Sequence, residues 1–141
     1  MSPTRSSFLT PLSVSGCGGP QRLSGSGSFT SHPQWDGNTE YPSSRCRWVL
    51  TAQGADKHVA LTFNQFDVEK GDGCTYDWVE VYDGASTTAA SLGRFCGRKK
   101  PRQLVSSGSQ MTVTFTADNS VSKPGFEATF KSVTGGKITI H

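Results

Sequence analysis

One stretch, from Phe66 to Gly84, constrains the fold of this chain more than any other. It places acids, glycines and one cysteine between two runs in which apolar residues occupy every second position. Those positions are Val59, Leu61 and Phe63 before the stretch, and Val79 and Val81 near its end. A period of two predicts strands that each bury one face. The chain is therefore expected to form a strand, a loop and a second strand here.

The loop between these two strands is suited to a cation. Residues 70–73, with the sequence Lys-Gly-Asp-Gly, can turn tightly, because glycine tolerates positive φ and Asp can bond to its own local backbone. Glu69 and Asp77 then stand at the two strand ends, where their carboxylates can converge on one ion. A metal site at this end is the first functional hypothesis.

The composition is that of an all-β protein with one core. The chain has 141 residues, of which 33% are hydrophobic, and its 16 glycines and 7 prolines separate short runs rich in Val, Thr, Phe and Trp. Strands are predicted at residues 28–30, 46–50, 58–66, 77–82, 111–117 and 125–131. Several half-buried strands at this spacing favour a two-sheet antiparallel β-sandwich.

The two ends of the chain differ from its centre. Residues 1–16 are rich in Ser, Thr and Pro and have little to bury, so they are expected to be a flexible tail or linker. The domain is expected to span residues 17–131. Residues 132–141 are either an additional edge strand or a flexible end.

Four cysteines, an even number, indicate disulfides rather than a metal cluster. Cys17, Cys46, Cys74 and Cys96 never form the close pairs that a structural zinc site needs. Three connectivities are open. Pairing neighbours in order would close two loops of moderate length, each stabilising by about 3 to 4 kcal/mol on the chain-entropy model. Paired cysteines imply an oxidising compartment.

Several function classes are not supported by the sequence. The net charge of +3 is too small to indicate nucleic-acid binding. No window is long and apolar enough for a membrane span, and the first residues lack a signal peptide, so an export signal is expected to lie elsewhere in a longer protein. Catalysis lacks support, because His32, His58 and His141 are scattered and each cysteine has an expected partner.

Taken together, the residues resemble one family, the CUB domain, an extracellular β-sandwich module. The resemblance covers Cys17 to about Lys131, and short motifs that are weak singly carry it by their order. They include Cys17-Gly18-Gly19, Tyr41-Pro42, Cys46-Arg47-Trp48, Phe66-Asp67-Val68-Glu69, Cys74-Thr75-Tyr76-Asp77, Val81-Tyr82-Asp83-Gly84, Phe95-Cys96-Gly97 and Gly125-Phe126. The family implies a jelly-roll-like sandwich with the disulfides Cys17–Cys46 and Cys74–Cys96.

A subset of this family binds calcium, and its signature positions are filled in this sequence. The resemblance implies that Glu69, Asp77 and Asp118 supply carboxylate oxygens and that backbone oxygen near Asn119 or Ser120 joins them. It also implies that the Tyr41 hydroxyl braces the site and faces the ligand. The chemistry agrees, because three converging carboxylates repel one another and invite a hard divalent ion. Calcium accepts six to eight oxygens at about 2.3 to 2.6 Å.

Two further features bear on binding. The run from 94 to 102 contains five cations, Arg94, Arg98, Lys99, Lys100 and Arg102. They form either a polyanion patch or a solvated loop, and the second interpretation is preferred because the run is short and kinked by Pro101. Trp35 stands near the customary tyrosine of a family turn, which is altered here. It lies in a polar loop not far from Tyr41, so it is a candidate anchor at a binding surface.

The sequence thus predicts a secreted, calcium-binding CUB module that recognises another extracellular protein by holding its Lys or Arg side chain. The module is expected to be non-catalytic, although it can belong to a larger protein such as a protease. One alternative is a glycosaminoglycan-binding module that uses the basic run. Another is a structural assembly module that self-associates through residues 1–16 and 132–141.

Overall fold

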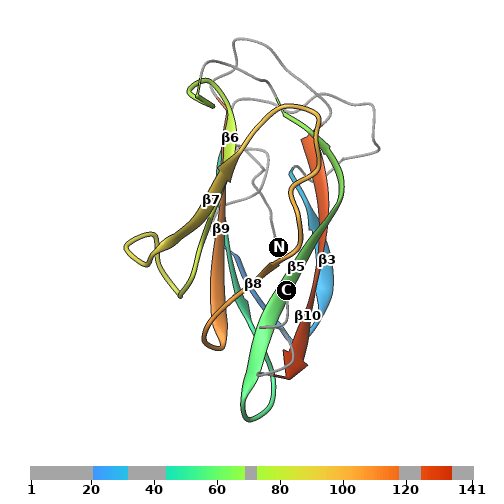
Figure 1. Ribbon diagram of the computed structural model, residues 1–141, viewed down its shortest axis with the longest axis vertical. Coiled ribbons are helices and arrows are strands. Elements are labelled where there is room, and N and C mark those ends of the chain that lie inside the picture. Colours follow the sequence, from blue (N-terminus) through green and yellow to red (C-terminus); the bar gives the residue numbers. More distant parts are fainter. Residues whose placement is uncertain (1–20, 32–43, 69–72, 118–124, 135–141) are drawn as a thin grey trace, which may run out of the picture.

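The computed structural model describes residues 21–31, 44–68, 73–117 and 125–134, and these form strands and loops (Figure 1). The strands are β2 (Gln21–Ser24), β3 (Gly27–Thr30), β4 (Ser44–Thr51), β5 (Lys57–Asp67), β6 (Trp78–Tyr82), β7 (Ser91–Phe95), β8 (Leu104–Val105), β9 (Gln110–Ala117) and β10 (Gly125–Thr134). The described part of the chain holds no helix of the length and hydropathy that a membrane crossing requires.

The strands form two sheets that face each other across a common core (Figure 1). One sheet has the order β3-β10-β5-β8, and the other has the order β2-β4-β9-β6-β7. The predicted all-β sandwich is confirmed. Its pairs are antiparallel except for β2 and β4, which run parallel. The strands β2, β7 and β8 were not predicted, and β10 continues through Thr134, beyond the expected domain end at residue 131.

Phe126 occupies the centre of the core and contacts aromatic rings from both sheets. Its ring centroid lies 5.8 Å from that of Trp48 and 5.5 Å from that of Phe115, both on the five-stranded sheet. It lies 5.6 Å from Phe63 and 6.1 Å from Phe29 on the four-stranded sheet. All four of these pairs are edge-to-face, an arrangement that adds to the stabilisation by burial. Trp48 is thus a core residue, as predicted.

An irregularity between β5 and β10 lets β5 bury two aromatic rings three residues apart. Glu127 pairs with Gln65, but the next residue of β10 pairs with Phe63, so the register shifts by one. Phe63 and Phe66 both face the core, while Asn64 and Gln65 between them are exposed. Strict alternation would have turned one of the two rings outward, so the bulge keeps both rings buried as β5 approaches its end.

Candidate functional site

The strand pairing brings several loop attachments to one end of the sandwich. Ser44 of β4 pairs with Ala117 at the end of β9, and Trp78 at the start of β6 pairs with the residue before Ala117. In the other sheet, Asp67 at the end of β5 pairs with Gly125 at the start of β10. These strand ends flank the segments 32–43, 69–72 and 118–124. The positions on either side of the predicted metal-binding segments therefore share one end, which we call the loop end.

Asp77 is the predicted calcium ligand that the structure describes. It directly precedes β6 at the loop end, and its exposed fraction is 0%. Burial of a carboxylate costs several kcal/mol unless the group is paired, hydrogen-bonded or bound to a metal. A fully buried acid at this place suits a cation ligand. The other predicted residues, Glu69, Asp118, Asn119, Ser120, Tyr41 and Trp35, lie outside the described residues, and the described residues alone form no cluster of three or more metal-binding side chains.

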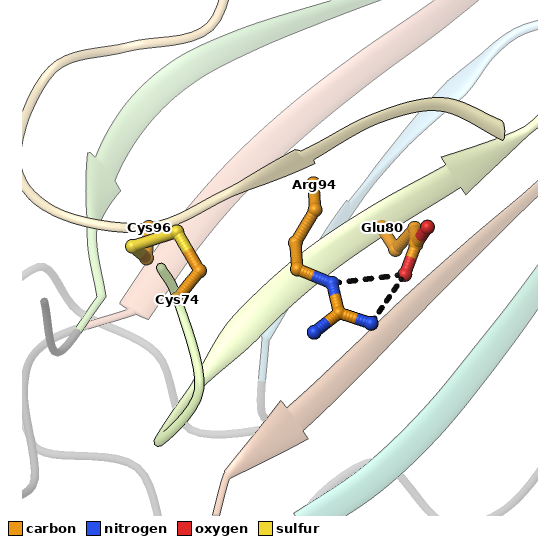
Figure 2. Close-up of a disulfide and its surroundings, with 4 residues drawn as sticks. All are labelled: Cys74, Glu80, Arg94 and Cys96. Carbon is orange, nitrogen blue, oxygen red and sulfur yellow. Dashed lines mark hydrogen bonds and ion pairs between the residues drawn. A yellow bond between two sulfur atoms is a disulfide. The ribbon is translucent and has the colours of Figure 1, made fainter. Parts of the chain in front are cut away.

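A disulfide and a strand bridge hold the segment that precedes Asp77. Cys74 is bonded to Cys96, with 5.6 Å between their Cα atoms (Figure 2). One residue further on, Gly97 exchanges two backbone hydrogen bonds with Val68, at 2.8 and 2.9 Å. Val68 follows β5 in one sheet, and Gly97 follows β7 in the other. Their bridge therefore links the two sheets close to the segment that precedes Asp77. The predicted pairing of Cys74 with Cys96 is confirmed.

The second predicted disulfide involves one residue that the structure describes. Cys46 is disulfide-bonded and lies in β4 with 4% of its surface exposed. Its predicted partner, Cys17, lies outside the described residues. The pairing Cys17–Cys46 therefore stays a prediction.

Asp67 adds a further carboxylate at the loop end that the sequence analysis did not single out. Its Oδ1 is buried and has no hydrogen-bond partner among the described residues. Its Oδ2 lies 3.9 Å from Nε of Arg98, whose side chain is 85% exposed, so this ion pair is weak. The position of Asp67 within the motif Phe66-Asp67-Val68-Glu69 was the only sequence signal.

A second polar cluster lies on the outer face of the five-stranded sheet, along the hairpin of β6 and β7. The Arg94 guanidinium donates a hydrogen bond from Nε to Oε1 of Glu80 at 3.1 Å, and its Nη2 forms an ion pair with the same oxygen at 3.0 Å (Figure 2). Ser91 donates to the other carboxylate oxygen at 2.9 Å. The guanidinium carbon also lies 4.3 Å from the centroid of the Trp78 ring, within the range of a cation–π contact. Arg94 therefore has a structural role in this hairpin.

The same cluster affects Tyr82. Burial raises the pKa of the Tyr82 hydroxyl above its usual value, and the nearby charge of Glu80 raises it further, while Arg94 acts in the opposite direction. Trp78, Glu80 and Tyr82 alternate with the buried Val79 and Val81, so they share the outer face. The alternation of these three residues could be read from the sequence, but their interactions with Arg94 on β7 could not.

The basic run is less concentrated than the sequence suggested. Arg94 belongs to β7 and is bonded to Glu80, and Arg98 lies beside Asp67. Lys99, Lys100 and Arg102 are exposed and form no ion pair with any residue that the structure describes. Arg94 is the cation of the run with a close ion pair, and a polyanion patch at this run stays a prediction.

Comparison with known proteins assigns the family. The profile of the CUB domain matches residues 17–130, well over half of the chain. The chain belongs to the CUB domain family. Human Tolloid-like protein 2 is 44% identical to it over 107 residues, which are 75% of this chain and 10% of that protein. Pig Cubilin is 40% identical over 119 residues, which are 82% of this chain and 3% of that protein.

The chain therefore spans about a tenth or less of these relatives, and the CUB module itself is non-catalytic.

Solved structures agree with the fold. The CUB1-EGF-CUB2 region of rat MASP-1 matches with a TM-score of 0.68 and 30% identity over 81% of this chain and 42% of that chain. The crystal structure of the MASP-1 CUB2 domain bound to Ca2+ matches with a TM-score of 0.64 and 28% identity over 78% of this chain and 96% of that chain.

Proposed function

We propose that this CUB domain binds one calcium ion at the loop end and uses the organised loops to recognise another extracellular protein. The observation that carries the proposal is the complete burial of Asp77 at the end where the predicted ligand segments attach. Glu69, Asp77 and Asp118 would supply the carboxylates. Backbone oxygen near Asn119 or Ser120 would complete the ligand set. The bound ion would offset the repulsion between these acids and fix the loops that carry them.

Two independent findings support calcium as the ion. The residue types are oxygen donors, which calcium prefers, and no His or Cys is among the predicted ligands. A related CUB domain, CUB2 of MASP-1, has been crystallised with Ca2+ bound. Magnesium is a poorer candidate, because it demands a near-octahedral cage that loop-borne ligands do not readily provide.

The partner is proposed to be an extracellular protein that presents a Lys or Arg side chain. Carboxylate oxygens that hold calcium keep outward lone pairs, which can accept charge-assisted hydrogen bonds from an ammonium or guanidinium group. Tyr41 and Trp35 would flank this contact. The Cys74–Cys96 disulfide fits an oxidising, extracellular compartment. Assembly through the tails stays a prediction, because residues 1–16 and 135–141 lie outside the described residues.

Retention on a lysine-rich peptide, in calcium and in chelator, tests this function. A fully acetylated copy of the peptide is the control, because acetylation removes the charge of each lysine. The proposal expects the protein to bind the free peptide in calcium only and to ignore the acetylated one. Asp77→Asn should abolish the retention. Equal retention in calcium and in chelator, or no retention in either, would overturn the proposal.

A further inference from the structure

The strands of the five-stranded sheet carry more positive charge than those of the four-stranded sheet. This difference does not depend on the predicted metal ligands of the loop end. The strands of the five-stranded sheet carry four arginines and one acid, which are Arg22, Arg45, Arg47, Arg94 and Glu80. The strands of the four-stranded sheet carry two lysines and two acids, which are Lys57, Lys131, Asp67 and Glu127. Among the described strands, the positive excess therefore belongs to one sheet.

Three of the arginines share one corner of the outer face. Arg45 and Arg47 alternate along β4 with the buried Cys46 and Trp48, so they point away from the core and are exposed. Two residues along a strand separate side chains by about 6.6 Å. Arg22 is exposed on β2, the neighbouring edge strand, where it pairs with the residue two beyond Arg47. We call this corner, formed by Arg22, Arg45 and Arg47, the arginine face.

Glu80, the acid of this sheet, does not pair with Arg22 or Arg47. Arg47 pairs with Thr114 on β9, and Thr114 pairs with Glu80 on β6, so two strand spacings of about 4.8 Å separate Arg47 from Glu80. Glu80 is bonded instead to Arg94 on its far side. Arg22 and Arg47 form no ion pair with any described residue. Neutral hydroxyls, those of Thr114 and Thr116, lie between the two clusters.

The face offers charge and hydrogen bonding but little apolar surface. Val49, the apolar side chain between Arg22 and Arg47, is only 4% exposed. The one large hydrophobic side chain that is exposed among the described residues is Tyr76, which lies in the loop before β6. Protein interfaces concentrate their binding energy in buried aromatic and apolar anchors. A hydrated linear polyanion requires only cations and hydrogen-bond partners.

We propose that the arginine face binds a sulfated polysaccharide of the extracellular matrix or cell surface. Each guanidinium can donate two parallel hydrogen bonds to the oxygens of one sulfate group, as it does to carboxylate and phosphate. Arg22 and Arg47, one strand and two residues apart, allow two sulfates of one chain to bind together. This site lies on a sheet and uses no calcium. The proposal can therefore be tested independently of the proposed metal site.

Heparin affinity, measured in chelator at about 0.15 M salt, tests this proposal. The test variant is R22Q/R47Q, and the matched control is K99Q/K100Q, which removes the same charge from the exposed basic run. Charge-assisted hydrogen bonds of this kind are each worth about tenfold in affinity, so R22Q/R47Q should bind about 100-fold more weakly. The control should change by less than about threefold, as expected for rim charges. Thermal melts should show that both variants remain folded.

Three further arms distinguish the ligand and the site. Desulfated heparin should bind at least about tenfold more weakly than heparin, because the arginines would lose the sulfate groups and keep only the uronate carboxylates as anionic partners. A poly-glutamate peptide that bound to the arginine face as tightly as heparin would overturn the polysaccharide assignment in favour of an acidic protein. An equal loss in R22Q/R47Q and K99Q/K100Q would overturn the location. Asp77→Asn should leave heparin affinity unchanged, so failure of the calcium proposal leaves this result interpretable.

Discussion

The interior of the sandwich and its loop end both bury side chains completely, but the two burials have opposite energetic consequences. Phe126 and Asp77 each have an exposed fraction of 0%. Phe126 is surrounded by rings from both sheets, so its burial stabilises the fold without any ligand. Asp77 is an acid, and its burial is favourable only when other groups compensate its charge. The interior is therefore the main source of stability, whereas the loop end is where we propose that a cation acts.

The largest expected effect comes from the interior. Phe126→Ala removes the ring that joins the two sheets, and truncation of a buried Phe costs about 3 to 5 kcal/mol of the free energy of unfolding. Urea denaturation measures this loss. Tyr76→Ala is the control, because Tyr76 is 50% exposed and its truncation should change stability by less than about 0.5 kcal/mol. A loss below about 1 kcal/mol in Phe126→Ala would show that the core does not depend on this ring.

The next effect concerns the covalent link beside Asp77. The double variant C74A/C96A opens a loop with a sequence separation of 22, so the chain-entropy model predicts a loss of about 3 kcal/mol. Calcium affinity should fall as well, because the segment before Asp77 loses its tether. Denaturation in chelator separates the first effect from the second. If the variant matched the wild type in both the free energy of unfolding and the calcium affinity, the disulfide would contribute to neither.

The contrast between the two regions is sharpened by Asp77→Asn, which keeps the shape of the side chain and removes its charge. Calcium at about 100 times its dissociation constant should stabilise the wild type by about 2.7 kcal/mol. The variant should lose most of this gain in thermal melts. Asp83→Asn is the matched control, because Oδ1 of Asp83 accepts a bond from the Ser107 amide and an Asn oxygen can still accept it. Loss of the calcium effect in both variants would mean that general charge, and not Asp77, is responsible.

The smallest effect belongs to the outer face of the five-stranded sheet. Glu80→Gln should lower stability by less than about 1 kcal/mol, because the Arg94 side chain is 40% exposed. The pKa of Tyr82 should fall, since Glu80 raises it, and Arg94→Gln should raise the pKa, since Arg94 lowers it. Ultraviolet titration of the phenolate measures both shifts. Equal shifts of the same sign would contradict the arrangement in which Tyr82 lies near both charges.

The raised pKa of Tyr82 also sets the direction of a pH dependence. The folded state favours the neutral hydroxyl, so the contribution of Tyr82 to stability is complete below the unfolded pKa, near 10. It is lost as the pH rises through the folded value. Because Glu80→Gln lowers that value, the variant should lose less stability than the wild type when the solution is made alkaline.

Strands with clear alternation were predictable, and strands without it were not. Val59, Leu61 and Phe63 marked β5 because every second residue is apolar. The segment Gln21–Ser24 has one apolar residue, and its position in the sheet depends on the parallel pairing with β4, which no local pattern reveals. β7 contains Gly93 at φ 147°, and its register with β6 shifts at Val81, so the partner of Glu80 could not be found from spacing alone.

The candidate site was predicted partly from chemistry and partly from the family resemblance. The acids Glu69 and Asp77 stood out because they bracket a glycine-containing turn between two strands. Asp118 is distant in sequence, and only the pairing of β6 with β9, in which Trp78 lies opposite Thr116, brings the end of β9 close to the start of β6. Asp67 was missed because its partial burial depends on the bulge and the bridge at the end of β5.

Calcium titration by calorimetry, on chelator-stripped protein with its disulfides intact, tests the central claim most directly. The account predicts one calcium ion bound per wild-type chain and greatly weakened binding in Asp77→Asn. No binding heat at several temperatures in the wild type, or undiminished binding in Asp77→Asn, would contradict it. Either of those results would leave the loop end as an ordinary group of polar turns.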